Sequence, residues 1–364
     1  MRRLSIYLAS IDEINQIRNP KGFTFRSKEM ERKLVSPVVI DDIQPIVGAD
    51  LIEVATVKGW KLVVKKNEFS IGDHAVYCEI DSFLPIREEF EFLRKSSYRK
   101  MGEQEGFRLK TMKLRGQISQ GLLLPVSLLE GYTYQIGEDV SARLGVIKYE
   151  PPVPAALGGI AKGLFPSFMP KTDEERIQNL SGQYEEFRKH TFYVTEKLDG
   201  SSATFYLNEG VFGVCSRNLD LEETEDNTFW KIARVEKLEE KLAALGKNFA
   251  IQGELIGEGV QGNAYGLRGQ TVRFFNAFDI DRYEYLGLDE FKALFASLGL
   301  QTVPILDEEY VLPASLDEML TIADGASVLS PKGKEVEREG LVIRSKDRKI
   351  SFKVISNKFL LNER

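Results

Sequence analysis

One short stretch near the middle of the chain, Glu196-Lys197-Leu198-Asp199-Gly200-Ser201-Ser202, limits what this sequence can fold into. It lies between two apolar runs, 190–195 and 203–207, and this pattern predicts a strand, a tight turn and a second strand. Gly200 would let the backbone come close to a ligand. A lysine beside an aspartate in such a turn is a candidate nucleophile, provided that a metal or second cation lowers its pKa from about 10.4. An ordinary Asp-Gly turn has the same letters, so the interpretation depends on residues elsewhere.

The composition excludes several other kinds of chemistry. The chain has 364 residues and is 43% hydrophobic and 29% charged, as expected of a globular protein with two or three domains. Its only cysteines are Cys78 and Cys215 and its only histidines are His74 and His190, and none lies in a zinc or catalytic motif. We therefore expect reduced cysteines, and chemistry that rests on Lys, Asp, Glu and Arg.

The sequence favours a soluble, intracellular protein, most simply a cytoplasmic one, with no membrane partner. No apolar run approaches the roughly 18 residues that a membrane span needs, and residues 1–4 lack the features of a secretory signal. The net charge of −6 argues against a wholly basic nucleic-acid coat protein, although it allows local basic strips.

Residues 1–150 are predicted to be rich in β-structure. Short apolar runs alternate there with glycine, proline and aspartate turn signals, at 38–43, 52–57, 61–64, 74–80 and 121–125. Strands at this spacing indicate a small barrel. The stretch 47–85 resembles the OB-fold modules that bind tRNA and other nucleic acids, which makes 1–150 a candidate nucleic-acid-binding domain. A barrel used only for packing is the alternative.

A basic segment follows the first barrel strands. Its cations are Arg94, Lys95, Arg99, Lys100, Arg108, Lys110, Lys113 and Arg115. Tyr98 and Phe107 lie among them. Because cations bind phosphates and aromatic rings stack on bases, this segment is the candidate nucleic-acid surface. An ordinary solvated charged face is the alternative.

The rest of the chain divides into a connection and a second domain. Prolines and glycines in 151–170 predict a linker, and a helix with Thr172 as its N-cap is expected to complete 151–189. Residues 190–364 are predicted to form an α+β domain on antiparallel sheet. The expected helices are 229–245 and 288–298, and the expected strands are 249–256, 272–280, 340–345 and 349–355. The glycines in 257–263 lack the Gly-Lys-Ser/Thr of a P-loop.

Further motifs follow Lys197 in order. They are Ser216-Arg217-Asn218, Gln252-Gly253-Glu254-Leu255, 275–280, 339–343 and Ser351-Phe352-Lys353-Val354. With the stretch around Lys197 they resemble the ordered motifs of the covalent nucleotidyltransferases, namely DNA ligases, RNA ligases and mRNA capping enzymes. The resemblance is greatest to ATP-dependent RNA ligases with an N-terminal OB module, because the OB-like region here precedes the other motifs. DNA ligases and capping enzymes usually carry that module after the catalytic domain.

The resemblance implies that several residues bind ATP. Lys197 would form the covalent lysyl-AMP. Glu196 would recognise the adenine amino group, Glu254 a ribose hydroxyl, and Phe275 would stack on adenine. Phe278, by contrast, is expected in the core. Arg217 and Asn218 would face the nucleotide and the end to be joined.

The resemblance also implies a metal and a phosphate contact. Asp199 and Glu339 would surround a catalytic Mg²⁺ or Mn²⁺ ion, and Lys353 would contact the α-phosphate. The last motif of the family usually carries two lysines one residue apart. Here only Lys353 matches, so Lys349 or Lys358 would supply the second cation.

The implied activity is ATP-dependent joining of a 3′-hydroxyl and a 5′-phosphate end, through lysyl-AMP and an adenylylated end. RNA or an RNA-containing nicked duplex would be the substrate, and RNA repair the role. One alternative is a nucleic-acid-binding protein with an inactive ligase-like domain, against which the intact Lys197, Asp199, Glu254 and Glu339 argue. The other is a DNA ligase or capping-type enzyme, against which the domain order argues.

Overall fold

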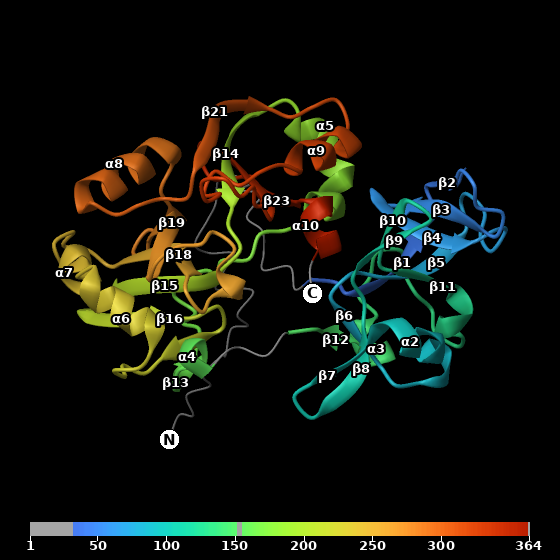
Figure 1. Ribbon diagram of the computed structural model, residues 1–364, viewed down its shortest axis with the longest axis horizontal. Helices are drawn as coiled ribbons and strands as arrows, with labels where there is room; N and C mark the ends of the chain where they lie inside the picture. The colour runs from blue at the N-terminus through green and yellow to red at the C-terminus, as the bar shows by residue number, and fades with distance from the viewer. Residues whose placement is uncertain (1–31, 151–154, 363–364) are drawn as a thin grey trace, which may run out of the picture.

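The computed structural model describes residues 32–150 and 155–362. The chain forms a smaller and a larger lobe, with the earlier part of the sequence in the smaller one (Figure 1). Expectations that fall on 1–31, 151–154 and 363–364, including the absence of a signal at 1–4, lie outside the described residues. None of the helices in the described part is both long enough and apolar enough to cross a membrane.

The smaller lobe is built from short strands in several small sheets. Its elements are β1 (Val35–Val39), β2 (Asp42–Pro45), β3 (Ile52–Val57), β4 (Trp60–Lys65), β5 (His74–Cys78), β6 (Ser82–Pro85), η1 (Glu88–Leu93), α2 (Arg94–Ser97), β7 (Tyr98–Met101), β8 (Gln104–Arg108), β9 (Thr111–Leu114), β10 (Gln117–Gln120), β11 (Leu122–Pro125), η2 (Val126–Leu129), α3 (Ser141–Leu144) and β12 (Ile147–Lys148). The sheets have the orders β1-β5-β11, β2-β3-β4, β12-β6-β8-β7 and β10-β9.

The barrel core explains why these strands form. Alternate residues of β3 and β4, among them Ala55, Val57, Trp60 and Leu62, lie in one buried cluster with residues of β5. The single strand predicted over 38–43 is in fact β1 and β2, because the chain changes partner there from β5 to β3. The predicted small β-barrel is confirmed, while the boundary at residue 150 stays a prediction.

The larger lobe is an α+β domain, as predicted. Its elements are α4 (Ala155–Gly158), β13 (Ala161–Leu164), η3 (Ile177–Gln183), α5 (Tyr184–Phe187), β14 (Thr191–Lys197), β15 (Ser201–Asn208), β16 (Val211–Cys215), β17 (Leu219–Leu221), α6 (Thr228–Val235), α7 (Leu238–Ala243), β18 (Phe249–Gly257), η4 (Gln261–Asn263), β19 (Gln270–Asp279), β20 (Glu284–Tyr285), α8 (Leu288–Leu298), β21 (Ile305–Val311), α9 (Leu316–Ala323), β22 (Gly340–Ser345), β23 (Ser351–Ile355) and α10 (Asn357–Asn362). Its antiparallel sheets have the orders β13-β17-β16-β15-β18-β19-β20 and β21-β14-β22-β23.

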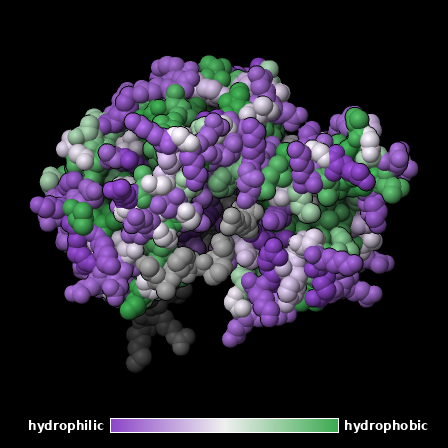
Figure 2. Space-filling model, in the orientation of Figure 1, coloured by the Kyte–Doolittle hydropathy of each residue, from purple (hydrophilic) through white to green (hydrophobic). Residues whose placement is uncertain are grey.

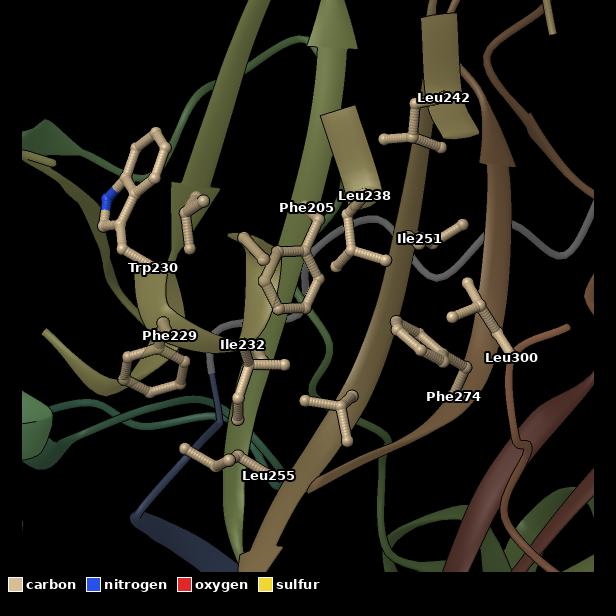
Figure 3. Packing of buried hydrophobic residues seen from close by; sticks show 14 of the residues in the cluster. Phe205, Phe229, Trp230, Ile232, Leu238, Leu242, Ile251, Leu255, Phe274 and Leu300 are labelled. Atoms are coloured by element: carbon tan, nitrogen blue, oxygen red, sulfur yellow. The ribbon is translucent and has the colours of Figure 1, made fainter. Parts of the chain in front are cut away.

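Helices α6 and α7 cover one face of the larger sheet (Figure 3). Phe205, Ile251 and Phe274 project from the strands toward Leu238 and Leu242 of α7, and all are buried in one cluster. Burying side chains of this size stabilises the fold by about 1.5–3 kcal/mol each. The single helix predicted over 229–245 is interrupted because Lys237 has a left-handed backbone with φ of 51°. Phe275, the neighbour of Phe274 on β19, lies outside this cluster and packs against a separate one that contains Leu198.

The connection between the lobes differs from the prediction. The helix expected after Thr172 begins only at Ile177, and Thr172 does not cap it, because its hydroxyl pairs with the Ser202 hydroxyl at 2.6 Å. The 170–176 segment instead lies along β23, where the Lys353 amide donates to the Glu175 carbonyl at 2.8 Å. Pairing with a strand thus replaces the first helical turn that local sequence favoured.

The lobes touch through β23 and α10 at the end of the larger one, and through η3 near its start. Ile355 of β23 and Leu360 of α10 are buried in the same cluster as the barrel strands. Trp60 donates its indole N–H to the Asn179 side chain at 3.0 Å. Figure 2 shows a hollow between the lobes with hydrophilic residues along its walls. The barrel is therefore held against β23, the strand that carries Lys353.

Candidate active site

The turn that carries Lys197 crosses from one sheet to the other. Strand β14, which ends at Lys197, pairs with β21 and β22, whereas β15 pairs with β16 and β18. The turn needs glycine at position 200, because a Cβ there would lie 2.3 Å from the Leu255 carbonyl oxygen. The Asp199 amide donates to the buried Tyr265 hydroxyl at 2.8 Å. Close backbone approach and one buried tyrosine therefore hold the turn in place.

Carboxylates surround the Lys197 amine. Its Nζ lies 2.7 Å from Glu339, and its side chain is 25% exposed. Burial lowers the pKa of Lys197, but Glu339, Glu254 and Asp199 outweigh this and raise the pKa overall. Burial, with added repulsion from Glu339 and Asp199, raises the pKa of Glu254 to about 8 despite the neighbouring Lys197. The structure therefore brings together four residues that the sequence predicted, in an environment with excess negative charge.

Glu196 and Phe275 lie where a base could be recognised. Glu196 is 1% exposed, and its Oε2 accepts the Val328 amide at 2.8 Å. Its Oε1 is buried without a hydrogen bond of normal geometry, and burial raises the pKa of the carboxyl although the nearby Ser327 hydroxyl and the Val328 amide lower it. Phe275 packs against a buried cluster that contains Leu198, and Leu329, the neighbour of Val328, packs against the same cluster. An unpaired buried acceptor near a half-buried ring suits a base that carries an amino group. Phe278 is core, as predicted.

Cations from separate motifs converge on one carboxylate. Lys353 on β23 lies 2.8 Å from an oxygen of Asp173. Arg217, in the turn between β16 and β17, lies 2.9 Å from the other oxygen, and Lys148 lies 3.9 Å from that same oxygen. Burial lowers the pKa of Lys353 to about 8, helped by Arg176 and Lys197 and opposed by Asp173. Lys353 is thus within electrostatic range of both Arg176 and the nucleophile candidate.

The other residues predicted to bind phosphate or nucleotide lie at the margins. Asn218 is half-buried beside Arg217, and its carbonyl accepts the Phe165 amide at 3.0 Å. Lys349 lies in the turn before β23 rather than on the strand, is 61% exposed and pairs with Asp347 at 3.0 Å. Lys358 is exposed on α10. The expectation that Lys349 shares a strand with Lys353 is wrong, because β23 begins only at Ser351.

Sequence reasoning missed Arg176, Asp173 and Lys148. Arg176 is 8% exposed, forms a parallel bridge with Lys353, and has Nε and Nη1 buried without partners. A buried guanidinium with unpaired nitrogens is suited to an anion. The run 173–176 carried no usable signal, since acidic residues followed by arginine fitted the expected helix start.

The donors around Lys197 fit a divalent ion that is shared with a substrate. Within residues 32–150 and 155–362, no group of three or more His, Cys, Asp or Glu side chains is arranged as a complete metal site. Asp199 and Glu339 nevertheless supply the oxygen donors that Mg²⁺ and Mn²⁺ prefer. Mg²⁺ is commonly bound by one or two carboxylates together with substrate phosphates and water, so a partial site suffices.

The basic segment is more neutralised than the sequence suggested. Arg94 pairs with Glu91 at 2.6 Å and Lys100 with Glu105 at 2.7 Å. Phe107 is 0% exposed, so the expectation that it stacks on bases is wrong. It lies on β8 in a second buried cluster of the smaller lobe, together with Leu84 and Phe90. Lys113 and Arg115 are exposed on the β9–β10 hairpin, which adjoins α10 through Gln120 and Asn357 at 3.1 Å.

Comparisons with known proteins agree with this geometry. Residues 34–126 match an OB-fold domain family, and residues 190–356 match the RNA ligase family. A mutant of Naegleria gruberi RNA ligase without ligand is 43% identical with a TM-score of 0.86, over 91% of this chain and 98% of that one. A lysine-to-alanine mutant of that ligase with ATP and Mn has the same identity and TM-score and is covered to 99%. No curated protein matches. The chain belongs to the RNA ligase family, with an OB-fold domain ahead of its ligase domain.

Proposed function

We propose that the protein is an ATP-dependent RNA ligase whose nucleophile is Lys197. The observation that carries this is the largely buried Lys197 amine between two sheets, 2.7 Å from Glu339 and within electrostatic range of Lys353. The related Naegleria ligase has been solved with ATP and Mn and with AMP and Mn, which supports the nucleotide and the metal. The matching family and structures are RNA ligases, so the DNA ligase, capping-enzyme and inactive-protein alternatives gain no support.

In the first step the Lys197 amine attacks the α-phosphorus of ATP. A nitrogen–phosphorus bond forms, pyrophosphate leaves, and the amine proton passes to solvent. Glu196 would accept the adenine amino group at its unpaired Oε1, and Phe275 would hold the base. The positive charges of Lys353 and Arg176 would offset the negative charge of the phosphates. A divalent ion held by Asp199 and Glu339 would offset the carboxylate charge that raises the pKa of Lys197.

The next steps transfer AMP to the RNA and close the strand. The 5′-phosphate oxygen of one end attacks the lysyl-AMP phosphorus, which frees Lys197 and leaves a pyrophosphate-linked AMP on the end. The 3′-hydroxyl oxygen of the other end then attacks the phosphorus of the adenylylated 5′-phosphate. A phosphodiester bond forms, AMP departs, and the hydroxyl proton passes to solvent. Arg217 is 52% exposed and Lys148 is 32% exposed, so both can reach the phosphates of an incoming end.

The substrate is RNA. We propose that its specific form is a nicked duplex that contains RNA, and that the role of the enzyme is RNA repair. Lys113 and Arg115 on the exposed β9–β10 hairpin would bind its backbone beside the larger lobe. The end that supplies the 3′-hydroxyl is expected to be RNA, because a terminal 2′-hydroxyl is the local mark that separates RNA from DNA.

The direct test is covalent labelling. With α-labelled ATP and a divalent ion, the wild-type protein should retain AMP after denaturing electrophoresis, and Lys197→Ala should lose it. Lys292→Ala removes an exposed lysine of α8 that pairs with Glu308 at 2.5 Å. This variant should label like the wild type. Equal labelling of Lys197→Ala and wild type would overturn the assignment of the nucleophile, and a preference for GTP would point to capping.

A second test concerns the RNA end. Nicked duplexes that differ only in the last sugar on the 3′-hydroxyl side should be sealed roughly tenfold to a hundredfold faster when that sugar is ribose. The reason is that a site which bonds the 2′-hydroxyl is left with unpaired polar groups, at a cost of about 1–3 kcal/mol, when the hydroxyl is missing. Equal rates for ribose and deoxyribose would contradict RNA specificity at this end.

A further inference from the structure

The Asp173 carboxylate forms ion pairs with the cations that would bind phosphate in the proposed reaction. Its Oδ1 lies 2.8 Å from the Lys353 amine, and its Oδ2 lies 2.9 Å from the Arg217 guanidinium. Lys148, from the last strand of the smaller lobe, lies 3.9 Å from Oδ2. One carboxylate therefore engages cations from β12, from the turn after β16 and from β23.

Asp173 is placed there by its neighbours in the 170–176 segment. The Thr172 hydroxyl pairs with Ser202 at 2.6 Å. Glu174 accepts the Ser351 hydroxyl at 2.6 Å and pairs with the buried Arg344 at 3.1 Å. The Glu175 carbonyl accepts the Lys353 amide at 2.8 Å. Because residues on both sides are anchored, the Asp173 ion pairs are part of a built arrangement rather than a loose surface contact.

The charge of Asp173 is permanent under ordinary conditions. Burial opposes ionisation, but Lys353, Arg217 and Lys148 outweigh it and hold the pKa of Asp173 well below its usual range. Carboxylates and phosphates are both anions that accept charge-assisted hydrogen bonds from ammonium and guanidinium groups. A substrate phosphate that used Lys353 and Arg217 would need the same donor hydrogens.

We propose that Asp173 is an internal stand-in for a substrate phosphate, which holds Lys353 and Arg217 together in the free enzyme and is displaced when a phosphate group binds. This inference rests on the proposed function, because it takes both cations as phosphate contacts. Every anionic ligand must then compete with Asp173. ATP overcomes this competition through its base and ribose contacts, whereas an anion without such contacts is excluded.

The test is Asp173→Asn, which removes the charge and keeps the shape. The KM for ATP in lysine labelling should fall about three- to tenfold, since charge competition of a partly exposed carboxylate is removed. Inhibition by inorganic phosphate should strengthen by a similar factor. Asp173→Glu keeps the negative charge, so it should bind ATP and inorganic phosphate more weakly than Asp173→Asn does. The matched control is Glu308→Gln, an exposed carboxylate on β21 that pairs with Lys292, and it should change neither value.

Binding is separated from chemistry by a second measurement. Equilibrium binding of ATP to Lys197→Ala should tighten about three- to tenfold when Asp173→Asn is added, although neither variant can form lysyl-AMP. An unchanged or weaker affinity in that pair would overturn the inference, and would assign Asp173 to structural support or to metal binding instead. Failure of the wild-type protein to label at all would overturn the proposed function, which is a separate result.

Discussion

At the scale of single residues, environment rather than side-chain type separates the lysines of the last motif. Lys353 is 16% exposed on β23, and burial lowers its pKa to about 8. Lys349 is 61% exposed and pairs with Asp347 in the preceding turn. Only the former lies among other cations of the site, Arg176 and Lys197. A partly desolvated cation interacts with a phosphate far more strongly than a solvated one.

We therefore predict opposite outcomes for the two alanine variants. Lys353→Ala should lower the rate of lysine labelling by roughly a hundredfold or more, as loss of a charge-stabilising group in a site usually does. Lys349→Ala should stay within about twofold of the wild type, because its charge is solvated and already paired. Single-turnover labelling rates would measure both. Similar losses in the two variants would show that Lys349 supplies the second cation after all.

Tyr265 is a positioning residue for the nucleophile. It is 4% exposed, and its hydroxyl accepts the Asp199 amide at 2.8 Å. Tyr265→Phe would remove the acceptor of this hydrogen bond, at a cost of about 1–3 kcal/mol. The labelling rate should fall roughly tenfold to a hundredfold, while the KM for ATP changes little.

Tyr132→Phe serves as the control for this prediction, because Arg143 lies over its ring in the smaller lobe and the residue is 37% exposed. It should label at the wild-type rate. If Tyr265→Phe changed only the KM, or changed nothing, the hydroxyl would have no part in holding the turn.

At the scale of elements, the 170–176 segment connects β23 with the barrel side of the molecule. Glu174 neutralises Arg344, which is 2% exposed in the centre of the smaller sheet of the larger lobe. Arg344 also donates to the Thr195 hydroxyl on β14 at 3.0 Å. A buried arginine depends on such partners, because a lone charge in the interior is strongly destabilising.

Glu174→Ala should therefore lower the free energy of unfolding by about 3–5 kcal/mol, since it leaves Arg344 buried without its ion pair. Urea denaturation followed by circular dichroism would measure this. Glu185→Ala removes a carboxylate that is 77% exposed and pairs with Arg188. The urea midpoint of this variant should therefore equal that of the wild type. A wild-type midpoint for Glu174→Ala would show that the segment does not support the sheet.

At the scale of the whole molecule, a cluster of charges joins the lobes. Asp81 of the barrel lies 3.4 Å from Arg176, 3.2 Å from Arg32 and 3.6 Å from Arg108. Burial alone would raise the pKa of Asp81, but the three arginines outweigh it and lower the pKa. The position of Arg176, a proposed phosphate contact, thus depends on a residue of the other lobe.

This cluster predicts a pH-dependent stability. Because the folded pKa of Asp81 lies below the unfolded value of about 3.9, its contribution is complete above that value and is lost as the pH falls through the folded pKa. Asp81→Asn should therefore be destabilised relative to the wild type at pH 7, and the difference should shrink below about pH 4. Urea midpoints from pH 3 to pH 7 would test this. Asp50→Asn, at an exposed position, should show no such trend, and a constant difference for Asp81→Asn would contradict the linkage.

Local patterns in the sequence determined the elements and their order. Strand β22 (Gly340–Ser345) and helix α8 (Leu288–Leu298) begin and end where the sequence predicts, because alternation, helical spacing and glycine turns act over a few residues. The motif residues Lys197, Glu254 and Glu339 could be chosen for the same reason, as each follows from neighbouring letters in a known order.

Only the tertiary structure decided which of these residues meet. Three features of the site depend on pairings between residues far apart in the chain. Strands β14 and β15 lie in different sheets, Asp173 binds Lys353, and Arg176 is buried beside Lys353. Such pairings are set by strand register and by the packing of the barrel against β23, and neither leaves a signal in the local sequence. Burial is decided at the same stage, and it is burial that distinguishes Lys353 from Lys349 and places Phe107 in the core.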